Sequence, residues 1–194
     1  MFDTPVALTA KFIKEDSAGH GAQLAFPGVS TCVAVVAQYD NELVGWHVTM
    51  GTIDNIDQRV YATGSAKFIE YLGGRVPVRL DIVGHVGGHD PTAIRDHVRA
   101  ALGGAVFPTE MFDIAGHTKG GAGSFDLFFS HVGQGHPNIF FKKTSKVKSA
   151  NISGGDAVAP VGLEKGYIPI YNRDADFTTQ NTHPVLRKHF VDVA

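Results

Sequence analysis

Short runs of apolar residues, some continuous and some alternating with polar ones, dominate the chain and predict mostly β-strands. In the first third we expect strands at Val6–Phe12 and Gln23–Phe26, separated by the turn-prone segment Asp16–Gly21. The next two apolar runs, Cys32–Tyr39 and Leu43–Met50, flank a short polar turn. Their lengths and spacing predict a β-hairpin.

Two segments have the spacing of amphipathic helices, and one strand lies between them. Asp54–Leu72 carries apolar residues on one helical face, and two glycines follow it. Apolar and polar residues then alternate over Val76–Ile82, which predicts a half-buried strand with Pro77 at its start or at a sheet edge. The sequence Asp90-Pro91 predicts an N-cap and first turn for a second helix, whose apolar stripe ends at Leu102.

The rest of the chain returns to strand patterns. We expect strands at Val106–Ile114 and Gly166–Tyr171, and a hairpin that pairs Phe125–His131 with Asn138–Thr144. The predicted fold class is α+β, with a mixed or antiparallel sheet core, in one sheet or two packed sheets, and two helices.

The pattern of apolar and polar residues becomes less regular after residue 146. Residues 1–146 hold the regular patterns and are predicted to form the core domain. Residues 147–194 are richer in turn-forming residues but retain Ile, Tyr, Phe and Leu, which a disordered tail would lack. We therefore expect an irregular C-terminal extension packed on the core.

Composition narrows the classes of function. The 194 residues are 43% hydrophobic and 19% charged with a net charge of −2, which argues against disorder and against a nucleic-acid partner. No apolar run approaches the roughly 20 residues that span a bilayer, and the N-terminus lacks the features of a cleavable secretory signal. We expect a protein that is cytoplasmic or delivered into another cell without such a signal, with no membrane partner.

Cofactor and metal chemistry find little support in the residues. The single cysteine excludes an intrachain disulfide and a cysteine-based zinc cluster. His85 and His89 have a plausible ligand spacing, but no third ligand lies near them in the sequence. We expect no cofactor and no metal.

The strongest candidate for chemistry is the pair Cys32 and His47 in the predicted hairpin. If the turn is centred on Tyr39-Asp40, the two residues face each other directly; if it is centred on Asp40-Asn41, they are diagonal neighbours on the same face. Either register places a thiol beside an imidazole. A neighbouring histidine is the usual activator of a thiol, because few thiols are ionised at neutral pH.

The competing interpretation is that Cys32 is a buried core residue, which is common for cysteine in an apolar run. Two details favour chemistry. Cys32 follows the polar pair Ser30-Thr31 at a loop-to-strand junction, where the amides of Thr31 and Cys32 are candidates for stabilising an oxyanion. Trp46, beside the candidate base, is a candidate for a pocket wall.

These motifs resemble two related families of glutamine deamidases. Cys-Val-Ala-Val at 32–35, Asp40 and Gly-Trp-His-Val-Thr-Met at 45–50 resemble the chemoreceptor deamidases called CheD. Val-Ser-Thr-Cys at 29–32 is similar to the Leu-Ser-Gly-Cys motif of toxin deamidases of the cytotoxic necrotizing factor type. The resemblance covers roughly residues 20–145 and implies a shared fold, with Cys32 as nucleophile, His47 as base and Ser30 as a neighbour of the motif.

The sequence departs from these patterns at two places. CheD proteins carry a threonine before the cysteine that orients the histidine, whereas this chain has Leu24-Ala25-Phe26 there. The toxins use a backbone carbonyl for that role. Thr31 also replaces the glycine that precedes the cysteine in both families. We therefore predict that a backbone carbonyl, or a side chain distant in the sequence, accepts a hydrogen bond from His47.

The resemblance implies a protein-glutamine deamidase that works through a thioester and acts on a partner protein that presents a glutamine, in chemotaxis or as a bacterial toxin or effector. The same residues would serve a transglutaminase if an amine replaced water. The alternative is a non-catalytic binding domain of the same fold with a structural cysteine.

Overall fold

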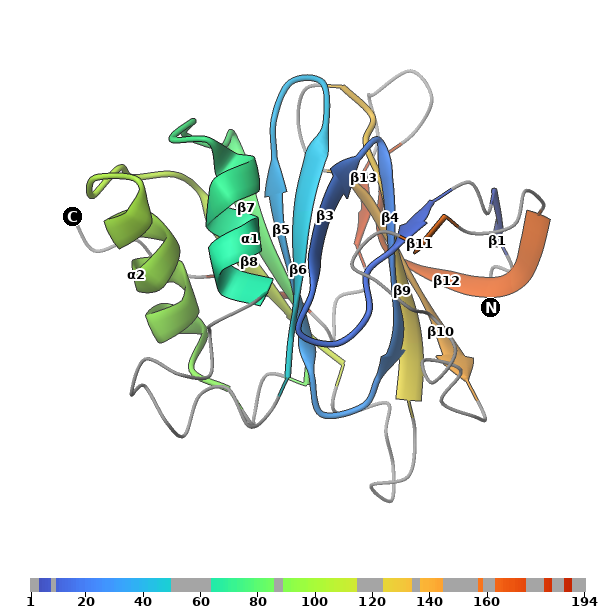
Figure 1. The fold of residues 1–194 in the computed structure, drawn as a ribbon. Helices are drawn as coiled ribbons and strands as arrows, with labels where there is room; N and C mark the ends of the chain where they lie inside the picture. Colours follow the sequence, from blue (N-terminus) through green and yellow to red (C-terminus); the bar gives the residue numbers. More distant parts are fainter. Residues whose placement is uncertain are drawn as a thin grey trace.

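In the computed structural model, two β-sheets lie face to face and two helices cover the outer face of one of them (Figure 1). Apolar side chains fill both interfaces between these three layers. The described residues thus confirm the predicted α+β class with two packed sheets, both of them mixed. The structure describes side chains in residues 10–49, 64–85, 89–114, 124–133 and 137–142, and only the backbone in 4–7, 143–144, 157–158, 163–173, 180–182 and 187–189.

The six-stranded sheet contains the predicted hairpin. β5 (Val33–Gln38) and β6 (Leu43–Val48) are antiparallel, with Ala34 opposite His47. The amide of Tyr39 donates to the Glu42 carbonyl at 2.9 Å and closes the turn at Asp40-Asn41. Of the two registers considered, this is the one that makes Cys32 and His47 diagonal neighbours. The order is β14-β8-β7-β5-β6-β3, with β3 at Ala18–Gly21, β7 at Arg79–Gly84, β8 at Thr109–Asp113 and β14 at Arg187–His189.

Two helices cover the outer face of this sheet, α1 (Gly64–Leu72) and α2 (Pro91–Ala101). The second begins as predicted, because the Asp90 side chain accepts hydrogen bonds from the amides of Thr92 and Ala93 at 3.0 and 3.1 Å. Residues 54–63 of the first predicted helix lie outside the described residues.

The eight-stranded sheet forms the third layer. Its hairpin of β9 and β10 has the predicted pairing, with Phe129 opposite Ile139. β12, within the predicted C-terminal extension, pairs with β10 and β1; the domain boundary at residue 146 stays a prediction. The order is β1-β12-β10-β9-β4-β2-β11, with β13 beside β12: β1 Thr4–Ala7, β2 Lys11–Phe12, β4 Gln23–Val29, β9 Ser124–Ser130, β10 Asn138–Thr144, β11 Ala157–Val158, β12 Leu163–Arg173 and β13 Gln180–Thr182.

Three sequence predictions are wrong in detail. The expected strand Val6–Phe12 is divided into β1 and β2, which pair with different strands of one sheet. The expected turn Asp16–Gly21 is largely strand β3, because main-chain pairing with β6 overrides its turn-forming residues. The strand expected at Val76–Ile82 begins only at Arg79, and all six residues of β7 are buried rather than alternately exposed. A strand covered by helices on one face and a second sheet on the other has no solvent-facing side.

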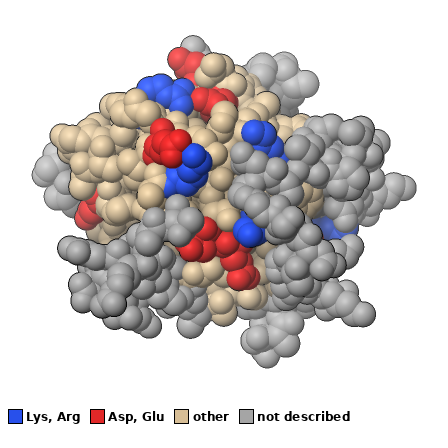
Figure 2. All heavy atoms as spheres, in the orientation of Figure 1, with Lys and Arg blue, Asp and Glu red and all other residues tan. Residues whose placement is uncertain are grey.

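Figure 2 shows acidic and basic side chains interspersed over the described part of one face. Two ion pairs of this kind join Arg75 to Glu42 at 2.9 Å and Lys67 to Glu70 at 2.8 Å. No helix within the described ranges has the length and apolar character needed to cross a membrane.

One ion pair lies inside the molecule. Asp81 is fully buried on β7, and the Arg79 guanidinium contacts its carboxylate oxygens at 3.2 and 3.3 Å. Arg79 also lies 3.3 Å from a carboxylate oxygen of Glu110 on the neighbouring β8. One guanidinium therefore bridges two carboxylates on adjacent strands.

We expect Asp81→Asn to lower the free energy of unfolding by about 1.5–3 kcal/mol, because it weakens the charge-assisted hydrogen bonds from the buried Arg79. Urea unfolding at pH 7 measures this loss. Asp96→Asn is the control, since that carboxylate forms an exposed pair with Arg95 on α2 and should change the stability by less than about 0.5 kcal/mol. Equal losses in the two variants would contradict a role for burial.

Candidate functional site

Cys32 lies in the short connection between β4 and β5, directly before β5 begins. Its side chain is 3% exposed and belongs to the apolar cluster between the two sheets. The amide of His85 donates to the Cys32 carbonyl at 3.1 Å. A Cβ atom on Gly84 would contact that carbonyl and lie 2.7 Å from the Val33 Cα, so the end of β7 presses closely on the cysteine backbone. The position of Cys32 is therefore fixed from two sides.

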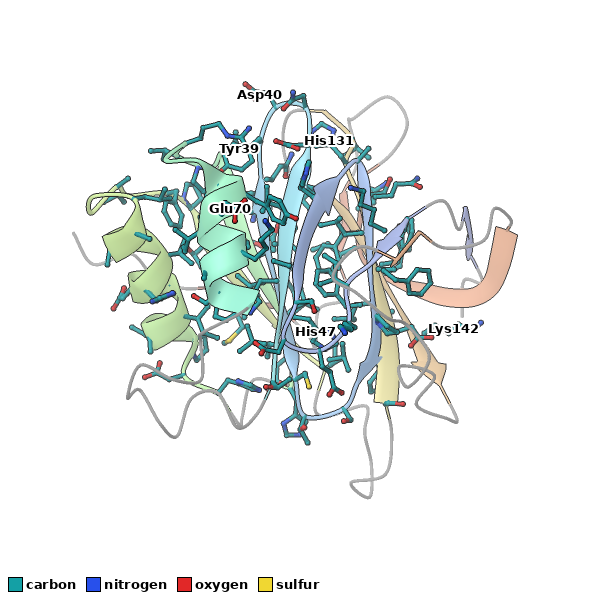
Figure 3. The ribbon with its side chains drawn as sticks, viewed as in Figure 1. Tyr39, Asp40, His47, Glu70, His131 and Lys142 are labelled. Carbon is teal, nitrogen blue, oxygen red and sulfur yellow. The ribbon has the colours of Figure 1, made fainter. Side chains whose placement is uncertain are left out.

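His47 lies on the same face of the sheet as Cys32. It pairs with Ala34, and Cys32 is two residues before Ala34, so their side chains project to the same side. Figure 3 shows His47 near one end of the strands, between the two sheets. The imidazole is fully buried and packs edge-on against the Phe26 ring, with ring centroids 5.8 Å apart.

The two nitrogens of His47 have different surroundings. Nδ1 donates to the backbone carbonyl of Ile13 at 3.0 Å, because a carbonyl can only accept. Nε2 has no hydrogen-bond partner among the described residues. Burial lowers the pKa of His47 from 6.5 to about 4, although the Ile13 carbonyl acts in the opposite direction. At neutral pH the ring is therefore uncharged, with its proton on Nδ1 and its lone pair on Nε2.

The prediction left open a backbone carbonyl or a distant side chain as the acceptor for His47, and the structure shows the carbonyl. This carbonyl belongs to a segment, Ile13–Ser17, that crosses from β2 in one sheet to β3 in the other; we call it the crossing segment. The amide of Asp16 donates to the His47 carbonyl, and the His47 amide donates to the Ser17 carbonyl, each at 2.9 Å. The crossing segment thus holds both the main chain and the ring of His47.

The motif residues before the cysteine lie at the surface end of the same connection. Thr31 is exposed and Ser30 is half-buried. The Thr31 carbonyl accepts a hydrogen bond from Nε2 of His89 at 2.6 Å, which ties this connection to the segment before α2. The role of the Thr31 and Cys32 amides in stabilising an oxyanion stays a prediction.

Trp46 does not line a pocket with Cys32 and His47, so that prediction is wrong. Successive residues of a strand project to opposite faces, and the Trp46 ring packs under the helices. Its neighbours there are Phe68 and His97, at centroid distances of 5.8 and 6.2 Å.

A surface cavity lined by described residues lies away from Cys32 and His47. It has a volume of about 340 Å³ and lies at the start of β4 and the end of β9, whereas Cys32 follows the end of β4. The ring nitrogens of His131 in its wall are both engaged, with the Tyr39 carbonyl and the Gly133 amide. The His131 ring is therefore not available as a base in this cavity, and we place the candidate chemistry at Cys32 and His47. The lining of the cavity consists of Lys11, Ala22, Gln23, Ser130 and His131.

Metal binding has no support at the described residues, where no group of three or more His, Cys, Asp or Glu side chains is arranged to hold an ion.

Comparison with known proteins finds no family model that matches the chain and no curated protein that matches it significantly.

Proposed function

We propose that the protein is a Cys–His amidohydrolase that deamidates glutamine side chains of a partner protein. The observation that carries the proposal is the state of His47. Its Nδ1–H is held by the Ile13 carbonyl, its Nε2 is buried and carries the lone pair, and its side chain shares a face with Cys32. A thiol with an ordinary pKa near 8.5 needs such a base at neutral pH.

The reaction would proceed in two halves. His47 Nε2 takes the proton from the Cys32 thiol, and the thiolate sulfur attacks the carboxamide carbon of the glutamine. The C–N bond breaks, and ammonia leaves with the proton that His47 returns. Water, deprotonated by the same nitrogen, then attacks the thioester carbon, and the C–S bond breaks to give glutamate and the free thiol. One amide and one water become one acid and one ammonia.

The choice of glutamine as substrate is supported by the resemblance of the 29–35 and 45–50 motifs to the CheD and toxin deamidases. The backbone carbonyl that orients His47 is the arrangement that the toxins use. A role as a toxin or effector delivered into another cell belongs to the same proposal. Conversion of glutamine to glutamate gives the partner one negative charge, enough to disrupt an interface or a catalytic glutamine.

The second candidate is a binding domain in which Cys32 is inert. It is favoured by the 3% exposure of Cys32 and by its apolar neighbours. In that case the unpartnered Nε2 of His47 is a buried polar atom without a chemical role.

Alkylation of the native protein separates the two candidates. We expect iodoacetamide to label Cys32 at pH 7 without denaturant, and His47→Gln to slow this labelling at least about tenfold because the thiol loses its base. Mass spectrometry of the intact protein measures both rates. Labelling only after addition of urea would exclude the enzyme and leave the binding domain.

The reaction class is tested with an unfolded protein substrate such as casein. We expect release of ammonia and a gain of about 1 Da at glutamine residues. Addition of a primary amine probe distinguishes the transglutaminase, which would attach the probe in place of water. The same mass gain in proteins of a cell extract would identify the physiological target.

A further inference from the structure

We propose that Gly45 is a positioning residue for His47, and this inference rests on the proposed function. Gly45 lies two residues before His47 on β6, on the face toward the second sheet. A Cβ atom on Gly45 would lie 2.7 Å from Phe26 Cζ, 2.8 Å from Leu24 Cδ1 and 2.9 Å from Ile13 Cδ1. Real Cβ atoms show such short contacts essentially never, so a side chain at this position would require the ends of these three side chains, or the segments that carry them, to shift.

Two of these three neighbours hold the imidazole. Ile13 supplies the carbonyl that accepts from Nδ1, and Phe26 supplies the ring against which the imidazole packs. The third, Leu24, lies on β4 two residues before Phe26. One small residue therefore packs against the side chains of both residues that contact the imidazole, the one that supplies the acceptor and the one that supplies the packing surface.

The neighbours have little room to yield separately. The Phe26 ring is held on another side by Phe129, with centroids 5.4 Å apart. The Ile13 amide donates to the Ala25 carbonyl at 2.8 Å, so the crossing segment is tied to β4 between Leu24 and Phe26. An added methyl group at Gly45 is accommodated either by rotation of these side-chain ends or by movement of β4 and the crossing segment away from β6, and we infer the second. The carbonyl would then move away from Nδ1.

The test is Gly45→Ala, followed by nitrogen NMR of the histidine rings. In the unmodified protein we expect His47 to be neutral with its proton on Nδ1. In Gly45→Ala we expect a mixture of the two neutral forms, because the Ile13 carbonyl no longer selects one. The rate of ammonia release should fall at least about tenfold with little change in KM, since a ring without a fixed tautomer carries its lone pair on Nε2 for only part of the time.

Two further variants keep the test decisive. Val98→Ala removes volume from the core under α2, on the other face of the sheet, and controls for a general loss of stability. It should keep the Nδ1–H form and change ammonia release by less than about twofold. Phe26→Leu is the milder substitution if Gly45→Ala does not fold. It removes the aromatic ring beside His47 and should likewise give a mixture of the two neutral forms of the imidazole.

The outcomes separate this inference from the proposed function. Retention of the Nδ1–H form in both Gly45→Ala and Phe26→Leu would overturn the positioning role, whatever the activity. The other informative outcome is a mixture of neutral forms in Gly45→Ala while the unmodified protein is not alkylated at Cys32 and releases no ammonia. That result would support the positioning role and refute the deamidase.

Discussion

Cys32→Ser is expected to abolish ammonia release while changing the melting temperature by no more than about 1 °C. Serine has nearly the volume of cysteine, but its hydroxyl proton is far harder to remove, so no nucleophile forms. His47→Gln should lower the rate by about 10²–10⁴-fold, the usual contribution of a general base. Ammonia release and calorimetry on the same preparations measure the two effects.

The control is His20→Gln, which replaces a partly exposed histidine paired with Glu42 and should leave the rate unchanged. The structural interpretation of Cys32 predicts the reverse pattern for Cys32→Ser. A hydroxyl placed among apolar neighbours without a partner costs about 1–3 kcal/mol, which lowers the melting temperature by about 2–4 °C for each kcal/mol. A Cys32→Ser protein that unfolds early but still releases ammonia would refute the proposed chemistry.

Acidification from pH 6.5 to pH 4 is expected to remove roughly 3 kcal/mol of stability through His47 alone. Burial lowers the pKa of His47 to about 4 in the folded protein, whereas the unfolded chain has the ordinary value of 6.5. Because the folded pKa is the lower one, the unfolded chain binds the proton first. The free energy of unfolding therefore has its full value, as far as His47 is concerned, above pH 6.5, and it falls as the pH falls toward 4.

Urea unfolding at several values between pH 7 and pH 4 measures this dependence. His47→Gln should be less stable than the unmodified protein at pH 7 and should lose much less stability on acidification. Burial also lowers the pKa of His97. His97→Gln is therefore the comparison: it keeps His47 and should still lose the stability that His47 loses on acidification. An unchanged pH dependence in His47→Gln would show that another group is responsible.

Local signals in the sequence were reliable where local contacts decide the structure. The start of α2 follows from Asp90 and Pro91 alone, and the hairpin of β5 and β6 follows from two apolar runs around a short turn. The face shared by Cys32 and His47 follows from the parity of their spacing. The same alternation places Trp46 on the opposite face, because neighbours in the sequence of a strand project to opposite sides of the sheet.

Features that depend on distant partners were not predictable. The strand character of Ala18–Gly21 exists only through pairing with β6. The burial of both faces of β7, with Arg79 and Asp81 on one face and Leu80 and Ile82 on the other, requires the helices and the second sheet together. The oxygen that orients His47 is a main-chain atom of Ile13, and no residue type marks such a position. The crowding at Gly45 likewise appears only when the two sheets are packed.

The use of a main-chain acceptor has an evolutionary consequence for position 13. Every amino acid carries the carbonyl that His47 requires, so selection at this position can preserve the geometry without preserving the side chain. Only the fit against Gly45 and the amide bonded to Ala25 restrict the choice, and proline lacks that amide. Position 13 is thus free to drift through many apolar residues. An inventory of side chains conserved among relatives would include the candidate pair Cys32 and His47 and omit the residue whose carbonyl orients the imidazole.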